Sequence, residues 1–194
     1  MIPYRSLLED IGACRRCEAH LALGPRPVLQ FHPAAKILIA GQAPGKKAHL
    51  SGIPFDDASG DRLREWLGVS RQQFYDASKI AILPMGFCFP GTGKSGDLPP
   101  RSECALAWRE SLLSRLQGLE LTLVLGKYAL DYHLTGPAVS VTESVLDWRS
   151  HWPTTVPLPH PSPRNVRWFN NNRWFERELV PQLRERVALL LRGD

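Results

Sequence analysis

Four short apolar runs recur along the chain, and each has the composition of a buried β-strand. The runs span residues 36–40, 79–83, 121–125 and 154–158. The first leads straight into the turn Gly-Gln-Ala-Pro-Gly (41–45), and the last ends at Pro159-His160-Pro161. Apolar character over so few residues, bounded by turn residues, predicts strands that are buried on both faces.

Helices are predicted before, between and after these runs, and the clearest apolar stripe at intervals of three or four residues lies in residues 101–116. The predicted helices span residues 4–23, 61–67, 101–116, the segment from 126 through 134, and 169–192. A Cys-x-x-Cys pair interrupts the first helix, and Pro181 bends or restarts the last one. The segment 86–100 is rich in glycine and proline and predicts a loop.

The alternation of strands and helices indicates an α/β fold whose parallel sheet is covered on both faces. In such sheets, ligands bind outside the carboxyl ends of the strands. Two loops of unusual composition, Gly-Gln-Ala-Pro-Gly (41–45) and His-Pro-Ser-Pro-Arg-Asn (160–165), each follow a strand directly. We therefore expect these two loops to meet at one edge of the sheet.

Length and composition fit one globular domain. The chain has 194 residues, of which 43% are hydrophobic and 22% are charged. This length supports one well-buried core and leaves little room for a second full domain. We therefore interpret residues 1–194 as a single domain.

The net charge is +5, and arginines gather in one part of the sequence. Between His160 and Arg177, a single acid, Glu176, stands against four arginines, which are Arg164, Arg167, Arg173 and Arg177. A basic excess alone says little about partners. A local basic patch is more informative, because it is typical of a surface that binds a polyanionic partner.

The N-terminal sequence does not predict a secretory signal, because acids occur early and an apolar run is lacking. The sequence also contains no stretch of the length needed to cross a membrane. We therefore expect a cytoplasmic protein without a membrane partner, and nothing in the sequence demands more than a monomer. In the cytosol, cysteines are more often ligands, nucleophiles or core residues than disulfide partners.

The four cysteines, Cys14, Cys17, Cys88 and Cys104, are the number needed for a Cys₄ metal site. Cys14 and Cys17 are three positions apart, as in a metal-binding pair, and a redox pair is the rival interpretation. Taken singly, Cys88 is compatible with a chance thiol in a loop and Cys104 with a core residue of its helix. Spacing alone does not separate zinc from an iron–sulfur cluster.

The order of these motifs resembles the iron–sulfur uracil-DNA glycosylases of bacteria and archaea. From about Cys14 to Glu178 the chain carries, in sequence, Cys-x-x-Cys, a strand with Gly-x-Ala-Pro-Gly, Gly-x-Pro-Phe, a cysteine in a proline/glycine loop, a cysteine on the next helix, and His-Pro-Ser-Pro. The resemblance implies a three-layer α/β/α sandwich with a central four-stranded parallel sheet. It also implies DNA as the partner.

The same resemblance implies a 4Fe-4S cluster, with zinc as the less favoured occupant. The ligands would be Cys14, Cys17, Cys88 and Cys104. In proteins of this type the cluster is regarded as structural and orders the loops that touch DNA.

The resemblance also assigns roles to residues of the cleft. Phe55 would stack on an extruded base, and His160 would stabilise the departing base anion. Asp57 would orient the attacking water, although an aspartate at this position also suits a helix cap. Further contacts to the base and to phosphates would come from Gly41, Ala43, Ser162, Arg164 and Asn165. The segment 163–165 would enter the minor groove in place of the extruded base.

Two positions depart from the pattern, which mixes features of the fourth and fifth families of this superfamily. One branch has glutamate at the position of Gln42, and an amide cannot take a proton from water, although it can position water or touch the base. The other branch has Asp-x-Ser-Gly, which residues 57–60 match. An asparagine that reads the uracil edge in the first branch is replaced by Pro84, which predicts a wider range of deaminated bases.

Three hypotheses follow from the sequence. The first is a monofunctional DNA glycosylase that hydrolyses the N-glycosidic bond of uracil and related deaminated bases. The second is a catalytically silent relative that keeps the fold, the cluster and DNA binding, which Gln42 and Pro84 favour. The third is a zinc or redox sensor that shares only the fold.

Overall fold

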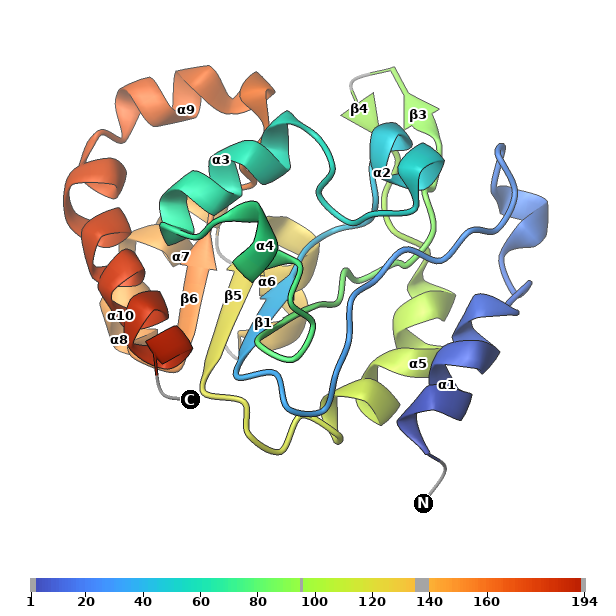
Figure 1. Cartoon of the computed structure of the whole chain (residues 1–194). Coiled ribbons are helices and arrows are strands. Elements are labelled where there is room, and N and C mark those ends of the chain that lie inside the picture. The colour runs from blue at the N-terminus through green and yellow to red at the C-terminus, as the bar shows by residue number, and fades with distance from the viewer. Residues whose placement is uncertain (1–2, 95, 135–139, 193–194) are drawn as a thin grey trace.

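The computed structural model describes residues 3–94, 96–134 and 140–192. Its core is a parallel sheet with the strand order β2-β1-β5-β6. The strands are β1 (Ile37–Ala40), β2 (Ile80–Ile82), β5 (Leu121–Leu125) and β6 (Thr155–Leu158). The four strands predicted from the apolar runs are thus confirmed. Because all pairs are parallel, the four carboxyl ends lie along one edge of the sheet, and Figure 1 shows β1, β5 and β6 running in the same direction.

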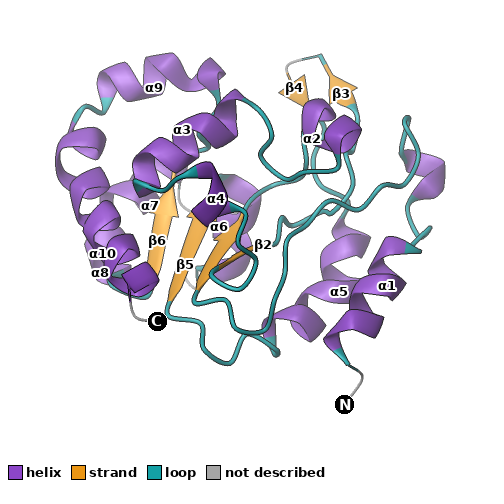
Figure 2. Cartoon of the chain, viewed as in Figure 1, coloured by secondary structure: helices purple, strands orange, loops and turns teal. Residues whose placement is uncertain are grey.

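Side chains alternate between the two faces of the sheet, and helices cover both faces. Ile37 and Ile39 of β1 pack toward α3 (Ala58–Leu67) and α10 (Val180–Arg192). Leu38 packs in a second cluster, with residues of α1 (Tyr4–Gly12) and α5 (Ser102–Leu113). Helix α6 (Lys127–His133) contributes Ala129 and Leu130 to a third cluster with Ala40 and Val124. The three-layer α/β/α sandwich is therefore confirmed (Figure 2).

Several short elements were not predicted. They are α2 (Lys46–Ser51), α4 (Arg71–Phe74), α7 (Val141–Leu146), α8 (Trp148–His151), and the two-stranded hairpin of β3 (Thr92–Gly93) and β4 (Gly96–Asp97). The helices have four to six residues, too few for a clear periodic pattern. The hairpin lies in the segment 86–100 that the sequence analysis assigned wholly to loop.

The first predicted helix was wrong in its extent. Helix α1 ends at Gly12, and the chain turns through the Cys-x-x-Cys segment into a short 3₁₀ helix at Glu18–His20. Leu7 and Ile11 are buried, whereas the next position of that stripe is Arg15, which is exposed. Without an apolar residue there, packing no longer favours continuation of the helix.

The predicted closing helix is divided into three. Helix α9 (Val166–Asn171) ends near Asn172, a π-helical turn follows at Phe175–Leu179, and α10 begins at Val180. The wide turn directly precedes Pro181, which has no N–H to donate to a regular helical bond. Helix α3 also differs from its prediction, because it begins at Ala58, directly after its cap Asp57.

Candidate active site

A cleft with a volume of about 230 Å³ opens at the carboxyl edge of the sheet. Loops after β1, β2 and β6 line it, together with the hairpin β3–β4. Eight of the nine residues that the sequence analysis assigned to a cleft line it: Gly41, Gln42, Ala43, Phe55, Asp57, His160, Ser162 and Arg164. The ninth, Asn165, is not among the lining residues, but its side chain donates to the carbonyl of His160. The two loops that were expected to meet therefore do meet.

The loop after β1 is fixed to the loop after β2 by two backbone hydrogen bonds. The N–H of Met85 donates to the carbonyl of Gly41 over 2.8 Å, and the N–H of Gly86 donates to the carbonyl of Gln42 over 3.0 Å. A Cβ atom on Gly41 would lie 3.5 Å from Cζ of Phe55. Because Gly41 has no side chain, its backbone packs directly against the Phe55 ring in the cleft.

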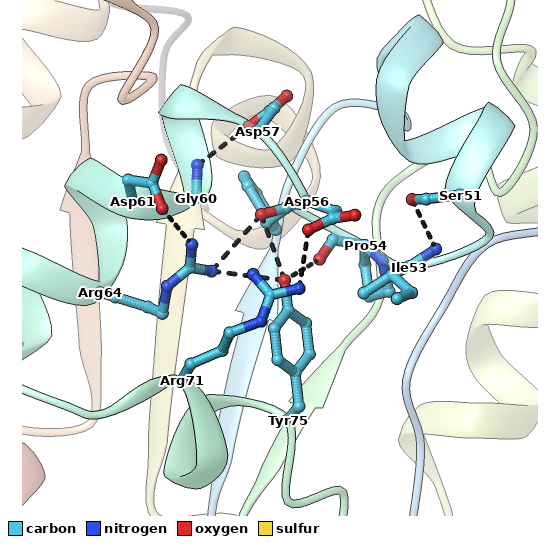
Figure 3. Close-up of polar contacts among 11 residues, drawn as sticks. Ser51, Ile53, Pro54, Asp56, Asp57, Gly60, Asp61, Arg64, Arg71 and Tyr75 are labelled. Carbon is cyan, nitrogen blue, oxygen red and sulfur yellow. Dashed lines mark hydrogen bonds and ion pairs between the residues drawn. The ribbon is translucent and has the colours of Figure 1, made fainter.

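Phe55 occupies a backbone conformation that side chains rarely adopt, with φ of 55°. Its carbonyl oxygen accepts hydrogen bonds from Oη of Tyr75 over 3.2 Å and from Nη1 of Arg64 over 3.4 Å. Tyr75 also donates to the carbonyl of Pro54 over 3.0 Å, and Arg64 forms an ion pair with Asp61 over 2.6 Å (Figure 3). These bonds hold the left-handed turn, so that the Phe55 ring faces the cleft.

Helix α3 closes this turn from the other side. A Cβ atom on Gly60 would lie 1.8 Å from the carbonyl oxygen of Phe55, so only glycine allows the helix to approach so closely. Oδ1 of Asp57 accepts a hydrogen bond from the N–H of Gly60 over 3.0 Å (Figure 3). Asp57 is therefore the cap of α3, as the sequence allowed, and it lines the cleft at the same time.

His160 lies just after β6 and is half-buried. Burial lowers the pKa of His160, and the negative charges of Asp57 and Asp97 oppose that shift. The imidazole is therefore neutral at pH 7 and has one ring N–H to donate. Nδ2 of Asn165 donates to the carbonyl of His160 over 2.8 Å. The side chain of Asn165 thus braces the loop in this structure.

Two features of the cleft escaped the sequence analysis. Asp97 of β4 lines it beside Gly45, but its segment was interpreted only as loop. Gln42 uses its side chain to donate to the carbonyl of Leu98 over 3.3 Å. The sequence Gly-Asp-Leu at 96–98 belongs to no recognised motif. It therefore predicted neither the place of Asp97 in the cleft nor the hydrogen bond between Gln42 and Leu98.

Pro84 also lines the cleft, and its carbonyl accepts a hydrogen bond from the buried Arg109. Nη1 of Arg109 donates to the carbonyls of Leu83 over 3.0 Å and Pro84 over 3.1 Å, and Nη2 lies 2.5 Å from Nε2 of His133. Arg109 is 1% exposed and belongs to α5, which also carries Cys104. Helix α5 therefore connects the cysteines to the wall of the cleft.

The loop after β6 presents basic side chains at the rim of the cleft. Nη1 of Arg164 lies 3.0 Å from where a Cβ on Gly96 would stand, so Arg164 reaches the hairpin on the far side. Oγ of Ser162 accepts a hydrogen bond from the N–H of Arg164 over 3.2 Å, and the carbonyl of Ser162 accepts one from Arg62 over 3.1 Å. These bonds fix the loop while leaving the Arg164 charge at the rim.

The four cysteines line one small cavity between α1, the loop at residue 88 and α5, beside the cleft. The N–H of Phe87 donates to Sγ of Cys104 over 3.3 Å. Burial raises the pKa of Cys104 to about 12, so this thiol on its own keeps its proton. Thiolates at such a site require a positive partner, which a metal centre supplies.

Within the described residues, no three His, Cys, Asp or Glu side chains stand close enough to hold a single metal ion. One zinc ion would need its sulfurs about 2.3 Å from a common centre. Cysteine sulfur is a ligand both for zinc and for the iron atoms of a cluster, so the type of donor alone does not choose between them. The donor set is thus compatible with an iron–sulfur cluster.

No helix in the described ranges is both long enough and apolar enough to span a membrane.

Comparison with known proteins places the chain in a family. A family model described as the uracil DNA glycosylase superfamily matches residues 29–184. A type-4 uracil-DNA glycosylase of Thermotoga maritima is 25% identical over 162 residues, which are 79% of each chain. A type-4 uracil-DNA glycosylase of Archaeoglobus fulgidus is 30% identical over 81 residues, which are 40% of this chain and 41% of that protein. The chain belongs to the uracil DNA glycosylase superfamily, as its motifs indicated.

Proposed function

We propose that this protein is a monofunctional DNA glycosylase that hydrolyses the N-glycosidic bond of uracil and other deaminated bases in DNA. The observation that carries the proposal is the meeting of Phe55, Asp57 and His160 in one cleft at the carboxyl edge of the sheet. An aromatic face, a carboxylate and a neutral imidazole are what base excision needs. The family membership of the chain agrees with this chemistry.

The side chains divide the reaction between them. A base extruded from the duplex stacks on Phe55, whose turn is fixed by Tyr75 and Arg64. As the bond from the sugar carbon to the base nitrogen breaks, the electron pair leaves with the base. The ring N–H of His160 stabilises the anion, and Asp57 orients the water that attacks the sugar carbon. Burial keeps His160 neutral, so it donates a hydrogen bond without having to lose a charge.

We expect a substrate range that is wider than uracil. Pro84 occupies the wall of the cleft, and proline has neither a backbone N–H nor a polar side chain with which to read a base edge. Its carbonyl already accepts a hydrogen bond from Arg109. Because Pro84 offers no donor to a base edge, this position should discriminate weakly between uracil and other deaminated bases such as hypoxanthine.

DNA would reach the cleft along the basic rim. Ser162 and neighbouring N–H groups would contact phosphates, and the segment 163–165, with Arg164 and Asn165, would fill the space left by the extruded base. The 3₁₀ turn at Pro163–Asn165 presents this segment as a compact projection. One copy of the chain provides every group named, so the proposal requires only a monomer.

We further propose that Cys14, Cys17, Cys88 and Cys104 bind a 4Fe-4S cluster, with zinc as the alternative. When bound, the cluster would act as a cross-link between α1, the loop at residue 88 and α5, without taking part in hydrolysis. The proposal places the protein in the cytosol with its DNA, where thiols remain reduced and available as ligands.

The test is an excision assay on oligonucleotides that contain uracil or hypoxanthine, followed by alkaline cleavage of abasic sites. Wild-type protein should give product, His160→Ala should abolish it, and Asp57→Asn should reduce it by about 10²-fold or more. The second candidate is the silent relative, which Gln42 favours because its amide cannot act as a base. Salt-sensitive DNA binding without product from any deaminated base would support that candidate instead.

A further inference from the structure

The side chain of Gln42 already forms a hydrogen bond within the protein. Its Nε2 donates to the carbonyl of Leu98 over 3.3 Å, which ties the loop after β1 to the residue following β4. An amide at this position connects two elements and takes no proton. Two carboxylates line the cleft in the part of the chain that the structure describes, and they belong to Asp57 and Asp97.

The two carboxylates converge on one region of the cleft from different elements. Oδ2 of Asp97 lies 3.6 Å from the position that a Cβ on Gly45 would occupy, and Oδ2 of Asp57 lies 3.7 Å from the same position. Both charges act on His160, since both oppose the lowering of its pKa by burial. Asp57 reaches this region from the cap of α3 and Asp97 from the hairpin.

The two carboxylates differ in their hydrogen bonds to the rest of the protein. Oδ1 of Asp57 is engaged with the N–H of Gly60, which fixes its orientation and leaves one oxygen toward the cleft. The carboxylate of Asp97 accepts no hydrogen bond from any described residue, although it lies beside the bonded pair of Gln42 and Leu98. Asp97 therefore has both oxygens available to accept a proton, whereas Asp57 is suited to orienting water.

The location of Asp97 has an electrostatic cost. Its side chain is exposed at the rim, on the face where Arg164 reaches the hairpin. A negative charge there repels the phosphates of approaching DNA, so it weakens binding. A part for this carboxylate in the reaction would offset the repulsion.

We propose that Asp97 is a second catalytic carboxylate, which accepts the proton of the attacking water while Asp57 orients that water. This inference rests on the proposed glycosylase function and names a residue of the same site. The water oxygen forms a bond to the sugar carbon as the bond from that carbon to the base breaks. The electron pair leaves with the base, whose anion His160 stabilises by its N–H. The water proton passes to Asp97 and then to solvent, and the base anion takes a proton from solvent.

This assignment also explains the amide at position 42. A carboxylate there could not donate to the carbonyl of Leu98 and would stand near Asp97 with the same charge. Gln42 instead fixes the residue next to Asp97 and so keeps the hairpin against the cleft. The cleft thus retains a proton acceptor, contributed by another element.

The test separates chemistry from binding. Single-turnover rates on a uracil-containing duplex would be measured at saturating protein for the wild type, Asp97→Asn and Asp57→Asn. Affinity would be measured by fluorescence anisotropy with a duplex that carries 2′-fluoro-deoxyuridine, whose glycosidic bond resists cleavage. Asp10→Asn is the charge-matched control, because Asp10 is exposed on α1 and lies outside the cleft.

We expect Asp97→Asn to lower the single-turnover rate by about 10²-fold. The same variant should bind DNA as tightly as the wild type or more tightly, because a repulsive charge is removed. A purely structural role of Asp97 would instead weaken binding and rate together, and this result would overturn the inference. A rate within about threefold of the wild type would also overturn it, while leaving the glycosylase function intact. A wild-type protein that releases no deaminated base would refute the proposed function itself.

Discussion

Replacement of Gly60 by alanine tests how tightly the fold fixes the cleft. The added Cβ would lie 1.8 Å from the carbonyl oxygen of Phe55, and Cβ atoms essentially never approach other heavy atoms within 3.0 Å. Either α3 or the Phe55 turn must therefore shift by on the order of 1 Å, a displacement that costs about 10²-fold in rate when it reaches reacting groups. The shift moves both Phe55 and Asp57, because Asp57 caps α3 through the N–H of Gly60.

The same displacement should also lower stability, because the atoms that the new Cβ would meet belong to the backbone of Phe55 and not to a flexible side chain. Alanine is favoured over glycine inside a helix by about 1 kcal/mol. Weakening of the hydrogen bonds from Tyr75 and Arg64 to the Phe55 carbonyl costs about 1–3 kcal/mol, so the two effects partly cancel. Gly60→Ala should thus melt below the wild type, by about 2–4 °C for each kcal/mol lost, and be about 10²-fold slower in single-turnover excision wherever it is folded.

The matched control is Gly12→Ala. Gly12 also lies within a helix, and nothing stands within 4 Å of the Cβ that would be added there. This variant should excise at the wild-type rate. If Gly60→Ala also excised at the wild-type rate, the argument that α3 fixes the Phe55 turn would be refuted.

Two further predictions concern the buried histidine beside Arg109 and the cysteines. Burial, and then the charge of Arg109, lower the pKa of His133 from 6.5 to about 3, so between these pH values the unfolded chain binds a proton that the folded protein does not. The free energy of unfolding should fall by up to about 1.4 kcal/mol per pH unit below pH 6.5 for this reason. Urea unfolding at pH 7, 6 and 5 should show a shallower fall for His133→Gln, which keeps an acceptor for Arg109, whereas parallel slopes would contradict the assignment. Cys104→Ser should abolish the visible absorbance of the purified protein and lower its iron content and melting temperature, while a colourless wild type with stoichiometric zinc would show that the cavity holds zinc.

The sequence predicted the sheet better than the details of the cleft, and the reason is physical. Strands such as 121–125 are buried on both faces, so their composition alone marks them. The meeting of the two loops follows from the same rule, because parallel strands bring their carboxyl ends to one edge. The roles of Tyr75 and Asp97 depend on contacts between segments distant in sequence, and no local pattern records them.

The ends of helices were also difficult to predict from local sequence patterns. The end of α1 at Gly12 and the break before Pro181 both depend on which side chains find a buried partner. Asp57 was considered both as a cap and as a cleft residue, and in the structure it is positioned as both. A single side chain that caps a helix and faces a cavity cannot be assigned from a motif alone, because each of its two oxygens has a different neighbour.

The central claim is that this cleft hydrolyses a glycosidic bond in DNA. Wild-type protein would be incubated with a uracil-containing duplex in water enriched in ¹⁸O, and both products would be analysed by mass spectrometry. Our account predicts free uracil without the label and an abasic sugar that has gained one ¹⁸O atom. Duplex that is bound by the protein but keeps its uracil attached would contradict it.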